Sequence, residues 1–228
     1  MALEITYYGH SCFGVKAAGK HLLFDPFITG NPKAAHIDIK QLQADYVLIS
    51  HAHGDHLADA LTILKNTQAC LISNFEIASY YEAKGVKRTE KLNFGGRVAT
   101  SFGHVRMVHA MHSSQFPDGT YGGNPGGFVV ESGDGNFYFA GDTALTLDLQ
   151  LIPRYATLKL AFLPIGGYFT MDYHDAAIAA EFLQCDTVIG MHYDSFPPIT
   201  IDHEAALKVF AEQQIKLLLL KVGERITI

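Results

Sequence analysis

The feature that most constrains the fold of this chain is a buried-strand pattern that runs directly into a cluster of polar side chains. Residues 45–50 (DYVLIS) form an apolar run of strand length, which indicates a buried strand. The six positions that follow, 51–56 (HAHGDH), hold three histidines and one aspartate. Leucines then recur at helical spacing across 57–65. The sequence therefore predicts a strand–turn–helix unit whose turn carries polar side chains at the end of the strand.

The types and spacing of these side chains point to a metal site. His51 and His53 are two positions apart, so their side chains point the same way in an extended segment. Gly54 permits a turn that brings Asp55 and His56 to a second point nearby. Imidazole and carboxylate are ligands that zinc and similar divalent ions prefer. Histidine accounts for only 12 of 228 residues, so we favour a metal site over a surface loop that is rich in histidine by chance.

The remaining pattern is that of an α/β domain. A β-rich stretch followed by strand–helix alternation occurs twice, which gives two halves of similar layout, about 1–115 and 116–228. No Pro- or Ser-rich linker separates the halves. We therefore expect one domain over residues 1–228, with the sheets inside and the helices outside. The helices are expected at 57–65, 74–84, 172–183 and 203–213.

Composition argues against several classes of function. Hydrophobic residues make up 48 % of the chain and charged residues 18 %, which is ordinary for a globular protein. The formal net charge is −6 and Lys and Arg are scattered, so the overall field disfavours nucleic-acid binding. A chain of this length needs no metal for folding. A metal bound here is therefore expected to serve chemistry, with a small molecule as substrate.

The cysteines and the N-terminus suggest a location. Cys12, Cys70 and Cys185 are widely spaced among apolar neighbours, which predicts small buried side chains rather than disulfides or a zinc site. The first residues lack the pattern of a signal peptide, and the longest apolar runs are too short to span a bilayer. We expect a cytoplasmic protein in a reducing compartment, without a membrane partner. The sequence does not determine the oligomeric state, and a homo-oligomer is one of the possibilities.

The segment 51–56 resembles the HxHxDH signature of the metallo-β-lactamase superfamily. That resemblance implies an αββα sandwich of two similar halves, and it extends over essentially the whole chain. It also implies three further ligands in a fixed order. A lone histidine after a β segment, an aspartate after a strand and a histidine at the end of a late strand are found at His112, Asp142 and His192.

The resemblance assigns a role to each of these residues. His51, His53 and His112 would bind a first metal ion. Asp55, His56 and His192 would bind a second, and Asp142 would bridge the two. A hydroxide held between the ions would be the nucleophile, and Asp55 would orient the attacking water or accept its proton. Two zinc ions suit this ligand set best, and manganese, iron or nickel are also compatible.

His109 competes with His112 for the third ligand position. The two residues lie on opposite faces of a strand if it continues that far. His112 is preferred because it lies at the end of the segment.

Other residues are candidates for supporting the ligands or contacting the substrate. Asp25 either fixes the tautomer of a ligand histidine or is a simple turn residue. His10 lies at a bend, from which it either approaches the site or serves the structure. Tyr168 and Phe169 follow a buried strand and are expected to line the cleft. His174 either reaches the substrate or has only a structural place at a helix N-terminus. The glycine-rich segment 119–127 is expected to be a mobile loop beside the pocket.

Four short motifs narrow the resemblance to small bacterial metal-dependent hydrolases that resemble ascorbate-6-phosphate lactonases. They are residues 9–13 (GHSCF), 25–27 (DPF), 141–143 (GDT) and 191–194 (MHYD). This branch implies a small ester, lactone or phosphate-bearing substrate.

Other classes remain possible at this stage. A diiron oxygen-reducing relative would carry Glu in place of His53, which disfavours it. A mononuclear iron dioxygenase would keep the same signature. A phosphodiesterase or nuclease that processes RNA would need an insertion and a basic surface, and neither is evident. A non-catalytic metal-binding protein is the remaining alternative.

Overall fold

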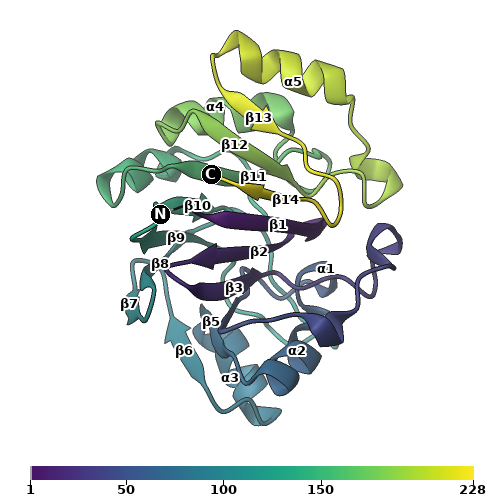
Figure 1. Cartoon of the computed structure of the whole chain (residues 1–228), viewed down its shortest axis with the longest axis vertical. Helices are drawn as coiled ribbons and strands as arrows, with labels where there is room; N and C mark the ends of the chain where they lie inside the picture. Colours follow the sequence, from purple (N-terminus) through teal and green to yellow (C-terminus); the bar gives the residue numbers. More distant parts are fainter. Residues whose placement is uncertain (1) are drawn as a thin grey trace.

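The computed structural model describes residues 2–228 and consists of two seven-stranded sheets with helices outside them (Figure 1). The first sheet contains β1 (Glu4–Gly9), β2 (Cys12–Ala17), β3 (Lys20–Phe24), β4 (Tyr46–Leu48), β5 (Cys70–Asn74), β6 (Thr89–Leu92) and β14 (Arg225–Thr227). Its order is β14-β1-β2-β3-β4-β5-β6. The strands from β14 to β3 pair antiparallel, and those from β3 to β6 pair in parallel.

The second sheet repeats this arrangement. It contains β7 (Arg97–Thr100), β8 (Gly103–His109), β9 (Gly126–Ser132), β10 (Phe137–Phe139), β11 (Leu160–Pro164), β12 (Thr187–Met191) and β13 (Lys216–Leu218). Its order is β13-β12-β11-β10-β9-β8-β7. The strands from β7 to β10 pair antiparallel, and those from β10 to β13 pair in parallel. Each sheet therefore joins an antiparallel hairpin region to a parallel region.

Aromatic side chains fill the space between the sheets. Phe24 of the first sheet stacks on Phe139 of the second, with ring centroids 4.7 Å apart. Phe13 and Phe162 also meet across the sheets, with tilted rings whose centroids are 4.8 Å apart. All four side chains are fully buried, and burial of each contributes roughly 1.5–3 kcal/mol. The predicted sandwich, with sheets inside and helices outside, is confirmed.

The helices cover the outer faces of the two sheets. α2 (Ala60–Thr67) and α3 (Phe75–Ala83) pack on the first sheet through an apolar cluster that includes Val47 and Leu71. α4 (Tyr173–Phe182) and α5 (His203–Glu212) pack on the second sheet, at the opposite side of the molecule (Figure 1). Asn74 accepts a hydrogen bond from the Ile77 N–H at 2.8 Å and so caps α3.

The helix expected at 57–65 is divided in the structure. A short helix, α1 (Gly54–Leu57), precedes α2. The break occurs at Asp59, whose backbone N–H donates to the Pro26 carbonyl at 3.1 Å rather than to the preceding turn. The Asp59 carboxylate also accepts the backbone N–H groups of residues 28 and 29. The break therefore ties the segment after β3 to the histidine-rich segment.

The two sheets do not divide the chain at residue 115. The chain passes from the first sheet to the second between Leu92 and Arg97, because β7 and β8 form a hairpin that pairs with β9. β14 then returns the end of the chain to the first sheet. The two sheets therefore do not coincide with the expected halves, 1–115 and 116–228.

The three cysteines have the environment that the sequence predicts. Cys12, Cys70 and Cys185 are all buried and free. Within residues 2–228, no helix has the length and apolar content needed to cross a membrane.

Candidate metal centre

The histidine-rich segment is held between the two sheets by backbone hydrogen bonds. It follows β4, and its Ser50 carbonyl accepts the Gly126 N–H at 3.0 Å. The Ala52 N–H donates to Ser114 Oγ at 3.1 Å. These bonds attach the segment to residues near β9 of the second sheet, so the ligand side chains of both sheets meet at one edge.

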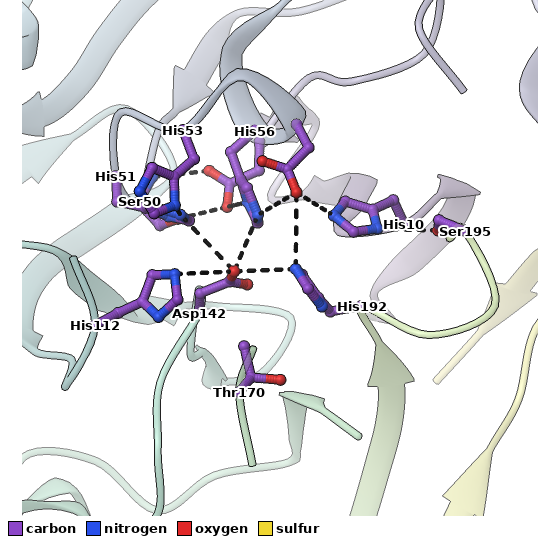
Figure 2. A network of polar contacts seen from close by, with 12 residues as sticks. His10, Ser50, His51, His53, His56, His112, Asp142, Thr170, His192 and Ser195 are labelled. Carbon is purple, nitrogen blue, oxygen red and sulfur yellow. Dashed lines mark hydrogen bonds and ion pairs between the residues drawn. The ribbon is translucent and has the colours of Figure 1, made fainter. Parts of the chain in front are cut away.

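One carboxylate oxygen lies at the centre of the polar cluster. Asp142 Oδ2 is 3.0 Å from His192 Nε2, 3.3 Å from His56 Nε2, 3.5 Å from His112 Nε2 and 3.8 Å from His51 Nε2. Figure 2 shows these imidazoles arranged around Asp142. Asp142 follows β10 and is 2 % exposed. Four nitrogens facing one buried oxygen is the arrangement expected when cations are held between them.

The potential ligand atoms form two main groups. His51, His53 and His112 offer atoms that all lie within 4.8 Å of one another. A second group with the same spacing contains His10, Asp55, His56 and His192. The structure thus brings together all seven residues that the resemblance implies as ligands, and it adds His10 to the second group. A third, overlapping group of Asp25, His51 and His56 lies behind the first two.

Asp25 determines which nitrogen of two histidines is free. His56 Nδ1 lies 2.8 Å from Asp25 Oδ2, so this nitrogen donates to the carboxylate. The Ser50 hydroxyl donates to the same carboxylate at 2.5 Å, which leaves its oxygen to accept from His51 Nδ1 at 2.9 Å. In the neutral form, each of these two histidines therefore carries its proton on Nδ1 and presents the lone pair of Nε2 toward Asp142. Such bonds fix the tautomer and ring orientation of metal-ligating histidines.

Unpartnered atoms show that these residues fit bound cations. His56 Nε2 and Asp142 Oδ1 are buried and have no hydrogen-bond partner. A buried polar atom without a partner costs about 1–3 kcal/mol. Divalent ions coordinated by imidazole and carboxylate would satisfy both atoms.

The electrostatics of the cluster also suit cations. Burial lowers the pKa of His51 and of His112, which keeps both imidazoles neutral and able to donate a lone pair. Burial alone would raise the pKa of Asp142, but His192 and His56 outweigh it and lower that pKa well below its usual range. Burial lowers the pKa of His56, but the Asp142 and Asp25 carboxylates outweigh it and raise that pKa. The carboxylates thus favour positive charge at the centre.

His10 connects Asp55 to the loop that follows β12. Its Nε2 lies 3.1 Å from Asp55 Oδ2, and its Nδ1 lies 2.9 Å from Ser195 Oγ. His10 is fully buried, and burial, with the nearby His192, lowers its pKa to about 4. Nε2 of the neutral ring donates a hydrogen bond to the Asp55 carboxylate, and Nδ1 accepts a hydrogen bond from the Ser195 hydroxyl. Burial would raise the pKa of Asp55, but the hydrogen bond from His10 and the charge of His56 lower it.

Three expected or competing residues lie away from the cluster. His109 Nδ1 pairs with Asp148 Oδ2 at 3.1 Å, while His112 faces Asp142; His112 lies beyond the end of β8, so strand alternation does not set their directions. His174 is exposed at the start of α4 and does not line the cavity described below. Tyr168 is 79 % exposed and does not line it either, because its positive φ of 57° directs the chain into a turn. Of the two aromatic residues expected to line the cleft, only Phe169 lines the cavity.

Sequence reasoning named Asp25 and His10 but missed three serines that hold the candidate ligands in position. No spacing pattern marks Ser50, Ser114 or Ser195. The glycine-rich segment 119–127, which we expected as a mobile loop beside the pocket, does not line the cavity described below, and its last two residues belong to β9. A Cβ atom on Gly122 would collide with Ala52 Cβ, so this segment packs directly under the ligand-bearing turn.

An open cavity of about 400 Å³ lies in front of the cluster. The residues that line it are His53, Asp55, His112, Ser113, Asp142, Phe169, His192, Phe196 and Pro198. Four of the proposed ligands besides Asp142 are therefore accessible from one cavity, which is the default place for a small-molecule site.

Comparison with known proteins places this geometry in a family. Residues 4–192 match the model of the β-lactamase superfamily domain. A UPF0173 metal-dependent hydrolase of Flavobacterium johnsoniae is 54 % identical over 98 % of this chain and 99 % of its own length. A UPF0173 metal-dependent hydrolase of Christiangramia forsetii is 52 % identical over 98 % of this chain and 99 % of its own length.

A solved structure agrees with these relatives. The novel metallo hydrolase from the archaeon Ignicoccus hospitalis matches with a TM-score of 0.89 and 34 % identity, over 100 % of this chain and 99 % of that chain. The match covers both sheets and the edge at which the histidines and carboxylates meet. The chain belongs to the metallo-β-lactamase superfamily.

Proposed function

We propose that this protein is a hydrolase that works with two divalent metal ions. The single observation that carries the proposal is the position of Asp142 Oδ2, which faces imidazoles of both ligand groups at 3.0–3.8 Å. His51, His53 and His112 would hold the first ion, Asp55, His56 and His192 would hold the second, and Asp142 would contribute to both. The printed names of the relatives as metal-dependent hydrolases support this assignment.

The chemistry follows from the ligands and their supports. Two divalent ions bound here would lower the pKa of a coordinated water from 15.7 to roughly 7 and would polarise the bond that is cleaved. Asp55 lines the cavity and stays ionised, so its carboxylate orients the attacking water and accepts its proton. His10 holds that carboxylate by a hydrogen bond of 3.1 Å. Asp25 keeps His56 and His51 in the tautomers that bind metal.

The cavity supports a small-molecule substrate. Its volume of about 400 Å³ suits a small ester or lactone, or a small phosphate-bearing compound. Zinc is the metal that best suits a set of imidazoles and carboxylates, and manganese, iron or nickel would also fit.

The rival functions have less support. A mononuclear iron dioxygenase would use one of the two ligand groups, whereas both groups here meet at the same carboxylate oxygen. A nuclease would need basic side chains along the cavity to bind phosphates. Among residues 2–228, none of the side chains that line the cavity is a Lys or Arg.

The proposal is tested by removing and restoring the metal. Protein stripped with a chelator should lose hydrolysis of a panel of esters, lactones and phosphodiesters, and two equivalents of zinc or manganese should restore it. One equivalent of iron that supports oxygen consumption without hydrolysis would establish the dioxygenase instead.

A further inference from the structure

The cavity in front of the cluster has two chemically different sides. The inner side carries the histidines and aspartates already described. The outer side is formed by Phe169, Phe196 and Pro198. Within the described part of the chain, residues 2–228, no Lys or Arg lines the cavity. A group that extends from the metal-facing side toward the entrance therefore meets apolar surface and no fixed positive charge.

The outer side is built from two loops that are held in place. Phe196 follows β12, and its ring packs against Phe27 at 6.2 Å and against His10 at 5.4 Å between centroids. Phe169 lies in the turn after β11, where its ring meets the edge of Tyr168 at 4.7 Å. The contacts with Phe27 and His10 keep Phe196 in place before a ligand binds, whereas Phe169 contacts its neighbour in the same exposed turn.

Phe169 is the exposed part of this surface. Its side chain is 51 % exposed although it lies at the cavity. Covering an exposed aromatic ring with an apolar group is favourable by about 25 cal/mol per Å² of buried surface. A charged group in the same place loses hydration without gaining a partner, which is unfavourable.

We infer that the site selects neutral esters or lactones that carry an apolar chain next to the scissile ester bond, and that it discriminates against a phosphate elsewhere on the substrate. This inference rests on the proposed hydrolase function and refines its substrate class. In the reaction, water adds across the acyl C–O bond: its oxygen bonds to the acyl carbon, the bond to the leaving oxygen breaks, and that oxygen takes a proton.

The expected size of the preference follows from the transfer of methylene groups. Each methylene that is removed from water on the apolar side raises kcat/KM by about fourfold, which corresponds to about 0.8 kcal/mol. Two further methylenes should therefore raise kcat/KM by about four- to fifteen-fold. The lower value applies if the chain is only partly covered, because the cavity is open on one side.

The test measures kcat/KM of the zinc-loaded protein for γ-valerolactone, γ-hexalactone and γ-octalactone, and for gluconolactone with and without a 6-phosphate. The inference predicts a rise with chain length and a lower value for the phosphorylated lactone. Phe169→Ala and Phe196→Ala should each flatten the rise. Phe75→Ala is the matched control, because Phe75 is 55 % exposed but lies outside the cavity.

A binding measurement adds a readout that needs no turnover. Calorimetry with butanoate, hexanoate and octanoate should show a Kd that falls with chain length in the zinc-loaded protein and is flat in Phe169→Ala. If the lactones are hydrolysed but kcat/KM does not change with chain length, or is higher for the phosphorylated lactone, the inference is overturned. The proposed hydrolase function then still stands. Absence of all hydrolysis by the fully loaded protein overturns the proposed function and this inference with it.

Discussion

Asp142 Oδ2 lies 3.0 Å from His192 Nε2, although the two residues follow different strands and are separated by 50 positions in the sequence. Asp142 follows β10 and His192 follows β12, with β11 between them in the sheet. Parallel strands place their carboxyl ends at one edge of a sheet, which is why these two side chains meet. The same edge receives the histidine-rich turn from the first sheet, so the centre lies between the sheets.

Replacing Asp142 should therefore affect both metal ions. Asp142→Asn keeps the size of the side chain but removes the negative charge that faces four imidazoles. Metal affinity should fall by more than the roughly 10–100-fold that is typical when a supporting residue is lost. Competition with a chelator measures this affinity. Asp148→Asn is the control, because Asp148 is exposed and pairs with His109 outside the cluster; equal metal affinity in the two variants would contradict the bridging position.

Asp55→Asn should remove most turnover with the fold intact. The asparagine oxygen still accepts the hydrogen bond from His10, but it neither carries the charge nor accepts a proton from water. A loss in kcat of about 10²–10⁴ is expected at saturating metal. Circular dichroism and metal analysis verify that the variant is folded and loaded. Unchanged hydrolysis by such protein would show that Asp55 does not have the assigned role.

Ser195 should act on the second metal ion through His10. Its hydroxyl donates to His10 Nδ1 at 2.9 Å and so directs the Nε2 proton to Asp55. Ser195→Ala should weaken binding of the second equivalent of zinc by about 10-fold, toward the lower end of the range for supporting residues. Calorimetric titration of zinc into protein stripped of metal with a chelator gives the affinities of the two zinc equivalents separately. Ser195→Thr keeps the hydroxyl and should restore the affinity; a defect of equal size in both variants points to packing instead.

Gly122→Ala should destabilise the fold by perturbing the ligand-bearing turn. The added methyl would collide with Ala52 Cβ and lie 2.6 Å from Ser114 Oγ. Overpacking of this kind costs about 1–3 kcal/mol, which lowers Tm by roughly 2–12 °C in a protein of this size. Gly133→Ala is the matched control, because a Cβ there has no atom within 4 Å and should change stability by less than about 0.5 kcal/mol. A native-like Tm for Gly122→Ala would contradict the packing.

The sequence predicts those parts of the centre that depend on local spacing. The turn 51–56 concentrates four candidate ligands, and His112, Asp142 and His192 each follow a β segment at the position that the resemblance implies. The sandwich architecture follows from the alternation of strands and helices in the same way. The turn 51–56 depends on residues that are close together in the chain, whereas His112, Asp142 and His192 are assigned by the resemblance.

Other features depend on contacts between distant residues and could not be predicted. The bond between His10 and Ser195 joins positions 185 residues apart, so no local pattern marks the serine. Tyr168 and Phe169 are neighbours of the same residue class, and only the turn geometry decides that Phe169 lines the cavity. The short strand β14 has mostly exposed residues, and its pairing with β1 comes from the fold rather than from its own pattern.

The metal content of gently purified protein is the most direct test of the central claim. Elemental analysis by mass spectrometry, divided by a protein concentration from amino-acid analysis, gives the number of ions for each chain. Two ligand groups that share one carboxylate predict about two equivalents of a divalent metal. A single tightly bound equivalent, with no second ion taken up on addition of zinc, would contradict the two-metal centre.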